Sequence, residues 1–443
     1  MNIIKGLYIH ERFFQAIAVI AVLFLVSFWF PVLYMLSWIG FGALSFLFLI
    51  DIIILFRFKN GLKARRILSE KFSNSDDNPI PITLENQYPF SIEVKVIDEL
   101  PKQFQKRDFE YTTSVEVGAK HDFEYAVKPV ERGEYHFGKL IAFVSSPLKI
   151  IAKRYKFDDT AMVSVYPSYI QMKKYEFLAM SNRLTEFGLK KIRRIGHTME
   201  FEQIKDYVAG DDVRTINWKS TAKRGQLMVN QYQDEKSQPI YSIIDLGRVM
   251  KMPFEELKLL DYAINSTLAF SNIALRKNDK AGMLTFSKEV ENIVQASNKK
   301  THLNTINEAL YNIDTQFTDS DFSLLYAVIK RKITHRSLLI LYTNFEHMSA
   351  MKRQLPFLKA IAKQHLLVTV FFENTELDEM ITTNAEDLQD VYHKTIAEKF
   401  AYEKRLIVKE LQNRGIHAIL TKPKNLTVNV INKYLEFKAK GFI

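Results

Sequence analysis

Residues 200–227 read EFEQIKDYVAGDDVRTINWKSTAKRGQL and are the most distinctive segment of the chain. Within this segment, Asp211 is a good N-cap for a helix, and Asp212 favours the first turn electrostatically. Gly225 stands where a helix of about three turns would stop, because glycine readily adopts the left-handed conformation found at helix C-termini. The segment therefore predicts one capped helix that ends at Arg224.

The predicted helix has an apolar face and a basic face. Val213 and Ile216 would point inward, while Trp218 is a large side chain that needs a pocket in this protein or in a partner. The outer side would carry Arg214, Lys219, Lys223 and Arg224. The candidate partner-binding residues are Asp212, Arg214, Trp218, Lys219 and Arg224. The alternative is a capped helix that only braces two domains.

The region after this segment alternates between buried strand-like runs and amphipathic helical runs. The predicted strands are Ile240–Asp245, Lys280–Phe286, Ser337–Thr343, Leu366–Phe372 and His417–Thr421. The predicted helices lie near Phe254–Leu275, Leu303–Ile313, Met348–Lys363, Asp387–Asn413 and Val428–Lys438. Apolar strands separated by helices predict a doubly wound α/β domain with a parallel sheet covered on both faces. Asp245, Ser287 and Asn344 would then lie at the carboxyl ends of strands, where such folds bind ligands.

The segment and its surroundings resemble bacterial membrane proteins with a DUF58 domain, whose C-terminal half is similar to a von Willebrand factor A domain. The resemblance rests on Glu200-Phe201, Tyr207, Gly210-Asp211-Asp212-x-Arg214-x-Ile216-x-Trp218-Lys219, Ala222, Arg224-Gly225, Leu227, Val229, Tyr232, Glu235 and Asp245. It implies an N-terminal membrane hairpin and a β-rich domain before the segment, and no established enzymatic activity. Such proteins are often encoded beside MoxR-type AAA+ ATPases. The resemblance therefore implies two kinds of partner, a MoxR-type ATPase and other von Willebrand A-type membrane proteins.

The resemblance also implies a place for Mg²⁺, held by an Asp-x-Ser-x-Ser motif, a Thr on a second loop and an Asp on a third. Hard oxygen ligands suit that ion. Here the motif position reads Asp245-Leu-Gly-Arg-Val, which lacks both serines and places Arg248 beside the site. The second- and third-loop candidates are Thr301 and Asn344. We therefore expect no cofactor, with these residues as remnants of a metal site in which Asp245 only caps the following turn.

Between about residues 73 and 171 the sequence changes to short alternating runs. Ile80–Leu84, Ser91–Ile97, Tyr111–Val117 and Phe123–Val130 combine period-two alternation with β-branched and aromatic residues, which indicates strands. Turn residues recur between them at a spacing that suits a small β-sandwich. The region contains no catalytic constellation, and it is typical of a spacer or interaction module.

The first sixty residues carry a long apolar run. From Phe13 to Phe56 the only ionic residue is Asp51, and the run divides near Pro31 into two predicted spans, about Phe13–Phe30 and Val32–Phe56. Basic residues flank the run on both sides, so the positive-inside rule predicts a hairpin in the bacterial inner membrane with both termini and all soluble domains in the cytoplasm. Asp51, near the cytoplasmic end, is expected to reach lipid headgroups rather than to serve a function.

The chain as a whole has 443 residues, no cysteine and a formal net charge of +11. The predicted parts are a membrane hairpin (1–58), a basic juxtamembrane linker (59–72), a β-sandwich domain (73–171), the distinctive segment (172–238) and an α/β domain (239–443). Lacking cysteine, the chain has no disulfides, thiolate metal sites or cysteine nucleophile.

No Gly-x-x-x-x-Gly-Lys loop, Gly-x-Gly-x-x-Gly turn or His-Glu-x-x-His motif occurs, so we expect no intrinsic catalysis. We expect instead a membrane-anchored cytoplasmic adaptor or scaffold that acts with a MoxR-type ATPase. The alternatives are a Mg²⁺-dependent ligand-binding receptor at the reduced metal site, and a nucleic-acid-binding protein that uses the basic stretch Arg183–Arg194. That stretch more simply faces anionic membrane lipid.

Overall fold

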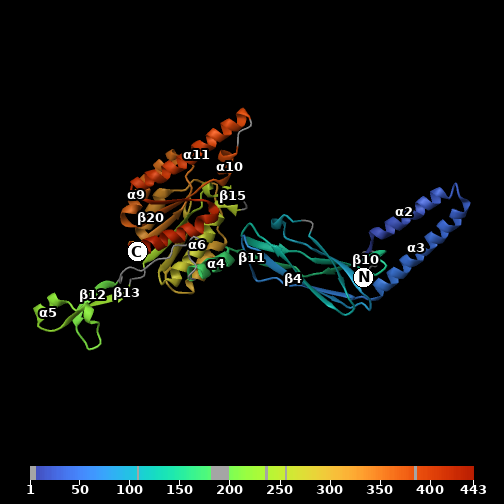
Figure 1. Ribbon diagram of the computed structural model, residues 1–443, viewed down its shortest axis with the longest axis horizontal. Coiled ribbons are helices and arrows are strands. Elements are labelled where there is room, and N and C mark those ends of the chain that lie inside the picture. Colours follow the sequence, from blue (N-terminus) through green and yellow to red (C-terminus); the bar gives the residue numbers. More distant parts are fainter. Residues whose placement is uncertain (1–5, 107–108, 181–198, 235–237, 255–256, 384–386) are drawn as a thin grey trace. The chain divides into compact units, whose positions relative to one another are not determined.

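The computed structural model describes residues 6–106, 109–180, 199–234, 238–254, 257–383 and 387–443, and Figure 1 shows it as a ribbon. The chain divides into two compact units, Met1–Tyr166 and Pro167–Ile443. The basic stretch Arg183–Arg194 lies outside the described residues.

After the short strand β1 (Leu7–Ile9), the first unit continues with two apolar helices, α2 (Glu11–Val26) and α3 (Pro31–Arg57). They run side by side, with the rings of Phe13 and Phe48 5.1 Å apart and those of Phe24 and Trp38 5.8 Å apart (Figure 1). Of the helices in the described part of the chain, α3 alone is long and apolar enough to cross a membrane. Because α2 has 16 residues, it falls short of that length.

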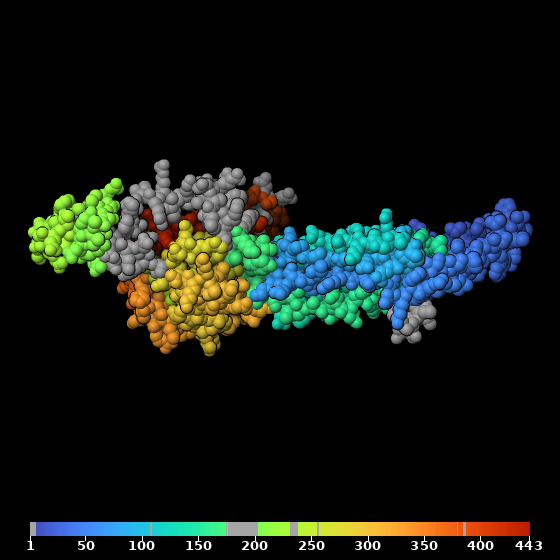
Figure 2. Space-filling model, turned by 90° about the horizontal axis from the view of Figure 1, so that it is seen from below, coloured from blue at the N-terminus to red at the C-terminus, as the bar shows by residue number. Residues whose placement is uncertain are grey.

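The rest of the first unit consists of β-strands, as the alternating pattern predicts. Three sheets have the orders β1-β10-β9-β5-β6, β3-β11-β8 and β2-β4-β7, and Figure 2 shows the helical pair (dark blue) extending from them. The strands are β1 (Leu7–Ile9), β2 (Leu62–Arg66), β3 (Lys71–Ser73), β4 (Asn78–Asn86), β5 (Ile92–Asp98), β6 (Glu110–Val115), β7 (Lys120–Val127), β8 (Gly133–Phe137), β9 (Leu140–Ser145), β10 (Ile151–Phe157) and β11 (Ala161–Tyr166). In β4 and β5 every second residue is buried, as period-two alternation requires.

The expected linker over residues 59–72 contains β2 and the first residues of β3, so half of it belongs to the sheets. Arg66, one of the basic residues assigned to that linker, is 4% exposed and forms an ion pair with Asp98 inside the unit. Burial raises the pKa of Asp98, and Arg66 only partly offsets this effect. Not every charge that follows α3 is therefore available to lipid headgroups.

Asp51 is the second position where the structure differs from the expectation. Its side chain is buried, and Oδ2 accepts hydrogen bonds from the backbone N–H groups of Ile150 and Ile151 at 3.2 and 3.0 Å. Nearby, the ammonium of buried Lys153 donates to the carbonyl oxygens of Leu55 and Phe58 at the C-terminal end of α3. The prediction that Asp51 reaches headgroups is wrong, because this carboxylate binds α3 to the strand that follows Ile150.

The second unit is built on a six-stranded sheet with the order β18-β17-β14-β19-β20-β21. Its strands are β14 (Pro239–Asp245), β17 (Lys280–Phe286), β18 (Val290–Ser297), β19 (Leu338–Tyr342), β20 (Leu366–Phe372) and β21 (His417–Thr421). All five predicted strands are present and pair in parallel. β18 was not predicted, and it pairs antiparallel with β17, so the sheet is mixed rather than purely parallel.

Helices cover both faces of this sheet, as the apolar strands predict (Figure 1). One face packs against α6 (Leu259–Arg276), α7 (His302–Tyr311) and α12 (Leu426–Ala439), and the other against α8 (Phe322–Lys332), α9 (Met348–Gln364) and α11 (Leu388–Asn413). The α8 helix and the short α10 (Thr375–Thr382) were not predicted. Helix α4 (Tyr169–Met180) packs on α6.

Candidate functional site

Asp245 is the last residue of β14 and is 1% exposed. Its Oδ1 accepts hydrogen bonds from the Gly247 N–H at 2.8 Å and from the Ser320 hydroxyl, and its Oδ2 accepts one from Thr343 Oγ1 at 2.7 Å. Burial raises the pKa of Asp245, and these three hydrogen bonds counteract the effect only in part. The bond to Gly247 agrees with the prediction that Asp245 caps the turn that follows it.

A cavity of about 290 Å³ opens beside Asp245 at the carboxyl ends of β14 and β19. Arg248 lies at its rim, and its guanidinium Nε is 3.2 Å from a carboxylate oxygen of Asp319. Both side chains are mostly exposed, so this ion pair contributes little to stability. The carboxyl-end rim of the sheet, where we predicted ligand binding, thus contains a small polar hollow.

The three predicted metal-site residues do not come together. Thr301 stands at the N-terminus of α7 and is not among the residues that line the hollow. Asn344 does line it, but its Oδ1 accepts a hydrogen bond from the ammonium of Lys404. The hydroxyl that reaches Asp245 belongs to Ser320, which the sequence reasoning missed together with α8. The available signal was Asp321, whose side chain caps that helix just after Ser320.

The residues at this hollow fit a divalent cation poorly. They offer one buried carboxylate with a raised pKa and two hydroxyls that already donate to it. The amide oxygen of Asn344 is occupied by a lysine ammonium, and Arg248 adds a second positive charge nearby. No group of three or more His, Cys, Asp or Glu side chains that could hold a metal occurs in the described ranges. Mg²⁺ prefers several hard oxygen ligands without competing cations.

The distinctive segment forms a small lobe from β12 (Met199–Asp206), a 3₁₀ turn (Val213–Thr215), α5 (Trp218–Arg224) and β13 (Met228–Asp234). The predicted single helix is therefore wrong, because the chain breaks between the turn and α5. At the break, the Asn217 N–H donates to the Met228 carbonyl at 2.8 Å, and Ile216 bridges to Val229. This pairing with β13 replaces the helical hydrogen bonds that one continuous helix would make.

Each short element of the lobe has its own cap. Asp212 accepts from the Arg214 N–H at 3.0 Å, and Asn217 accepts from the Ser220 N–H at 3.1 Å. Asp211 caps neither element, but its carboxylate accepts a hydrogen bond from the Val208 N–H at 3.0 Å. This bond and the hydrogen bond from Lys205 hold the pKa of Asp211 below its usual value. Gly225 ends α5 with φ = 72°, as predicted. Of the candidate partner-binding residues, Asp212 thus has a structural role.

The surface of the lobe is more apolar than predicted. Trp218 is 69% exposed, and Val213, which was expected to point inward, is 64% exposed. Val208 at 62% and Leu227 at 45% are also exposed. The lobe carries exposed basic residues as well, namely Arg214, Lys219, Lys223 and Arg224. We call the exposed apolar and basic residues of the turn, α5 and Leu227 the α5 surface.

Comparisons with known proteins support part of the resemblance. The uncharacterized protein YeaD of Bacillus subtilis (strain 168) is 24% identical over 264 residues, which are 57% of this chain and 63% of that protein. The structure of the conserved hypothetical protein BatB from Bacteroides thetaiotaomicron covers 46% of this chain and 99% of its own, with 11% identity and a TM-score of 0.29. The SpRpn10 VWA domain covers 44% of this chain and 94% of its own, with 8% identity and a TM-score of 0.28.

The family comparison falls on the lobe and most of the α/β unit. The matched residues begin in β12, continue through the α5 surface and Asp245, and end in the first part of α11. Residues 203–393 match the family described as protein of unknown function DUF58.

Proposed function

We propose that this protein is a membrane-anchored interaction protein that docks a protein partner on the α5 surface. The observation that carries the proposal is the exposure of Trp218, at 69%, on a lobe whose own helix caps and turns are already satisfied. A tryptophan is a costly residue to leave in water and is enriched at the energetic centres of interfaces. Val213 and Leu227 extend the apolar area around it.

The charge of the α5 surface indicates the kind of partner. Arg214, Lys219, Lys223 and Arg224 lie on the same short elements as Trp218 and form no ion pair with other described residues. Cations at the rim of an interface steer an acidic partner and raise the rate of association. The proposed partner is therefore a protein with an acidic patch around an apolar pocket. The resemblance to DUF58 membrane proteins makes a MoxR-type AAA+ ATPase the first candidate.

The anchor in this proposal is the α2–α3 pair. The apolar surface of α3 faces outward along most of its length, and Phe28, Trp29 and Phe30 at the connection between the helices are 85%, 71% and 62% exposed. Aromatic residues favour the membrane interface. The proposal takes both helices as a hairpin in a bacterial inner membrane, with the sheets and the lobe in the cytoplasm. The protein has no catalytic role in this account.

A binding assay with purified components tests the proposal. The full chain in phosphatidylcholine nanodiscs is titrated with a purified MoxR-type ATPase from the same organism. Trp218→Ala and Arg224→Glu are expected to weaken binding at least tenfold, since a hot-spot residue contributes about 2 kcal/mol or more. The matched controls are Tyr402→Ala, an aromatic residue 58% exposed on α11, and Lys330→Glu, an exposed lysine on α8. Equal binding by all five proteins would refute docking at the α5 surface.

A further inference from the structure

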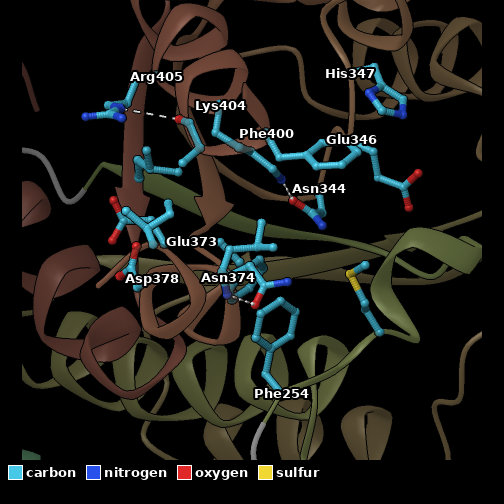
Figure 3. Close-up of a pocket in the computed structure, with 16 residues that line it drawn as sticks. Phe254, Asn344, Glu346, His347, Glu373, Asn374, Asp378, Phe400, Lys404 and Arg405 are labelled. Carbon is cyan, nitrogen blue, oxygen red and sulfur yellow. Dashed lines mark hydrogen bonds between the residues drawn. The ribbon is translucent and has the colours of Figure 1, made fainter. Parts of the chain in front are cut away.

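A second and larger cavity, of about 520 Å³, lies at the carboxyl ends of β19, β20 and β21, and Figure 3 shows its lining. Its base and walls include Phe254, Phe372, Phe400, Leu377 and Ile381, from the β15 strand (Pro253–Phe254), β20, α11 and α10. This volume lies in the range of pockets that bind small molecules, which are mostly apolar with a few polar groups. The cavity is distinct from the α5 surface and shares only Asn344, Glu346 and His347 with the hollow at Asp245.

Lys404, which is less exposed than its neighbour Arg405, is a cation that lines this cavity. Lys404 lies one turn after Phe400 on α11, so both side chains project from the same face of that helix. The Lys404 side chain reaches from α11 to Asn344, and its ammonium donates to the amide Oδ1 (Figure 3). An ammonium has three N–H donors, and this is its one hydrogen bond to the described residues. Lys404 is half-buried, and burial lowers the pKa of its ammonium to about 8.

The acidic residues of the cavity do not neutralise this charge from inside. Glu346 attracts the ammonium electrostatically but is itself exposed to solvent. Asp378 lies 2.8 Å from the ammonium of Lys422, and the half-buried Glu373 also acts on Lys422 rather than on Lys404. Lys404 forms no ion pair within the part of the chain that the structure describes. The inner end of Lys404 is therefore a cation without a buried anion, beside an apolar space.

From this geometry we infer that the cavity binds a small amphipathic carboxylate, whose apolar body packs against Phe254, Phe372 and Phe400 while its carboxylate accepts hydrogen bonds from Lys404. Charge-assisted hydrogen bonds of this kind are about twice as strong as neutral ones. The same chemistry is offered by a soluble aromatic acid and by a fatty acid released from lipid. The class is defined by one anionic head on an apolar body.

Titration calorimetry on the full chain in phosphatidylcholine nanodiscs tests this inference with 2-naphthoate and its neutral isostere, 2-naphthamide. We expect 2-naphthoate to bind at least about tenfold more tightly than the amide. The neutral amide cannot form the charge-assisted hydrogen bond that a carboxylate makes with the Lys404 ammonium. Lys404→Met should abolish this preference, and Lys409→Met, an exposed lysine on the same helix, should leave it unchanged. Competition between decanoate and 2-naphthoate then distinguishes the acyl from the aromatic source.

The pH dependence gives a second readout that does not depend on how well methionine fills the site. The charged or titratable groups that also line the cavity are Glu346, His347, Glu373, Asp378 and Arg405. Because Lys404 loses its proton near pH 8, wild-type affinity for 2-naphthoate should fall between pH 7 and 10, and this fall should be absent in Lys404→Met. Equal affinity for acid and amide, an unchanged preference in Lys404→Met, or no binding of either probe would overturn the inference.

Discussion

The α5 surface and the rim around Asp245 arrange their side chains in opposite ways. At the rim, the polar groups of Asp245, Thr343 and Asn344 are buried and bind other groups of the same unit. On the lobe, the polar groups cap the lobe itself, and large apolar side chains such as Trp218 remain in solvent. Buried, mutually satisfied polar groups stabilise a fold, whereas exposed apolar groups need another explanation. This contrast supports a structural role for the rim and the proposed binding role for the lobe.

The largest effect is expected at the rim. Asp245→Ala leaves the hydroxyls of Ser320 and Thr343 and the N–H of Gly247 without their acceptor, so the α/β unit should lose about 2–4 kcal/mol of its free energy of unfolding. Native-state hydrogen exchange of the β14 and β19 amides measures this loss for the unit alone. Asp319→Ala, an exposed neighbour, is the control and should change stability by less than about 0.5 kcal/mol. A loss below 1 kcal/mol for Asp245→Ala would contradict the structural role.

A smaller effect is expected from the titration of Lys404. The folded-state pKa of Lys404, about 8, lies below the value in an unfolded chain. Above pH 8 the unfolded state therefore binds more protons at this residue than the folded state does. The wild type should therefore become more stable relative to Lys404→Met as the pH rises from 8 to about 10.4. After allowance for solvent screening of this half-buried side chain, we expect about 1–2 kcal/mol.

Hydrogen exchange of the β20 amides at pH 8, 9 and 10 checks the sign of this effect. Lys409→Met serves as the control, since it removes an exposed lysine of α11. A difference between wild type and Lys404→Met that stays constant with pH would show that the ammonium is well solvated.

The caps of the lobe should have a more modest effect. Asn217→Ala removes the acceptor for the Ser220 N–H and the side-chain bond to Asn230, so protection of the β12 and β13 amides should fall by about 1 kcal/mol. The stability of the six-stranded sheet should not change, because these bonds all lie within the lobe. A loss that spreads to β14 would show that the lobe and the sheet unfold as one unit.

Trp218 should have the smallest effect on stability, although it should have the largest effect on binding. Trp218→Ala should change the protection of β13 by less than about 0.5 kcal/mol, since 69% of the side chain is already exposed. A loss above 1 kcal/mol would mean that Trp218 stabilises the lobe itself, and the contrast between lobe and rim would disappear.

The parts of the fold that follow from hydrophobic periodicity could be predicted from the sequence. β14 and β19–β21 are continuous apolar runs, and α9 and α11 start within one residue of their predicted positions. β18 was missed because its mixture of polar and apolar residues suits an edge strand as well as a loop. Asp51 was misjudged because its partners, Ile150 and Ile151, lie about a hundred residues away in the sequence.

The candidate site was predicted less well, for a similar reason. Asn344 was correctly placed at the rim beside Asp245, but Ser320, from the loop before α8, and Lys404, from α11, reach these residues through contacts that no local pattern records. On the lobe, the Gly225 stop followed from local chemistry, whereas the break before Trp218 depends on pairing with β13. Contacts distant in sequence decided each of these differences.

In the proposed function, the α5 surface and not the rim docks the partner. The most direct measurement is the affinity of the nanodisc-embedded chain for a purified MoxR-type ATPase, compared between Trp218→Ala and Asp319→Ala, which alter the lobe and the rim respectively. The account predicts at least a tenfold loss for Trp218→Ala and an unchanged affinity for Asp319→Ala. An unchanged affinity for Trp218→Ala together with a loss for Asp319→Ala would contradict it.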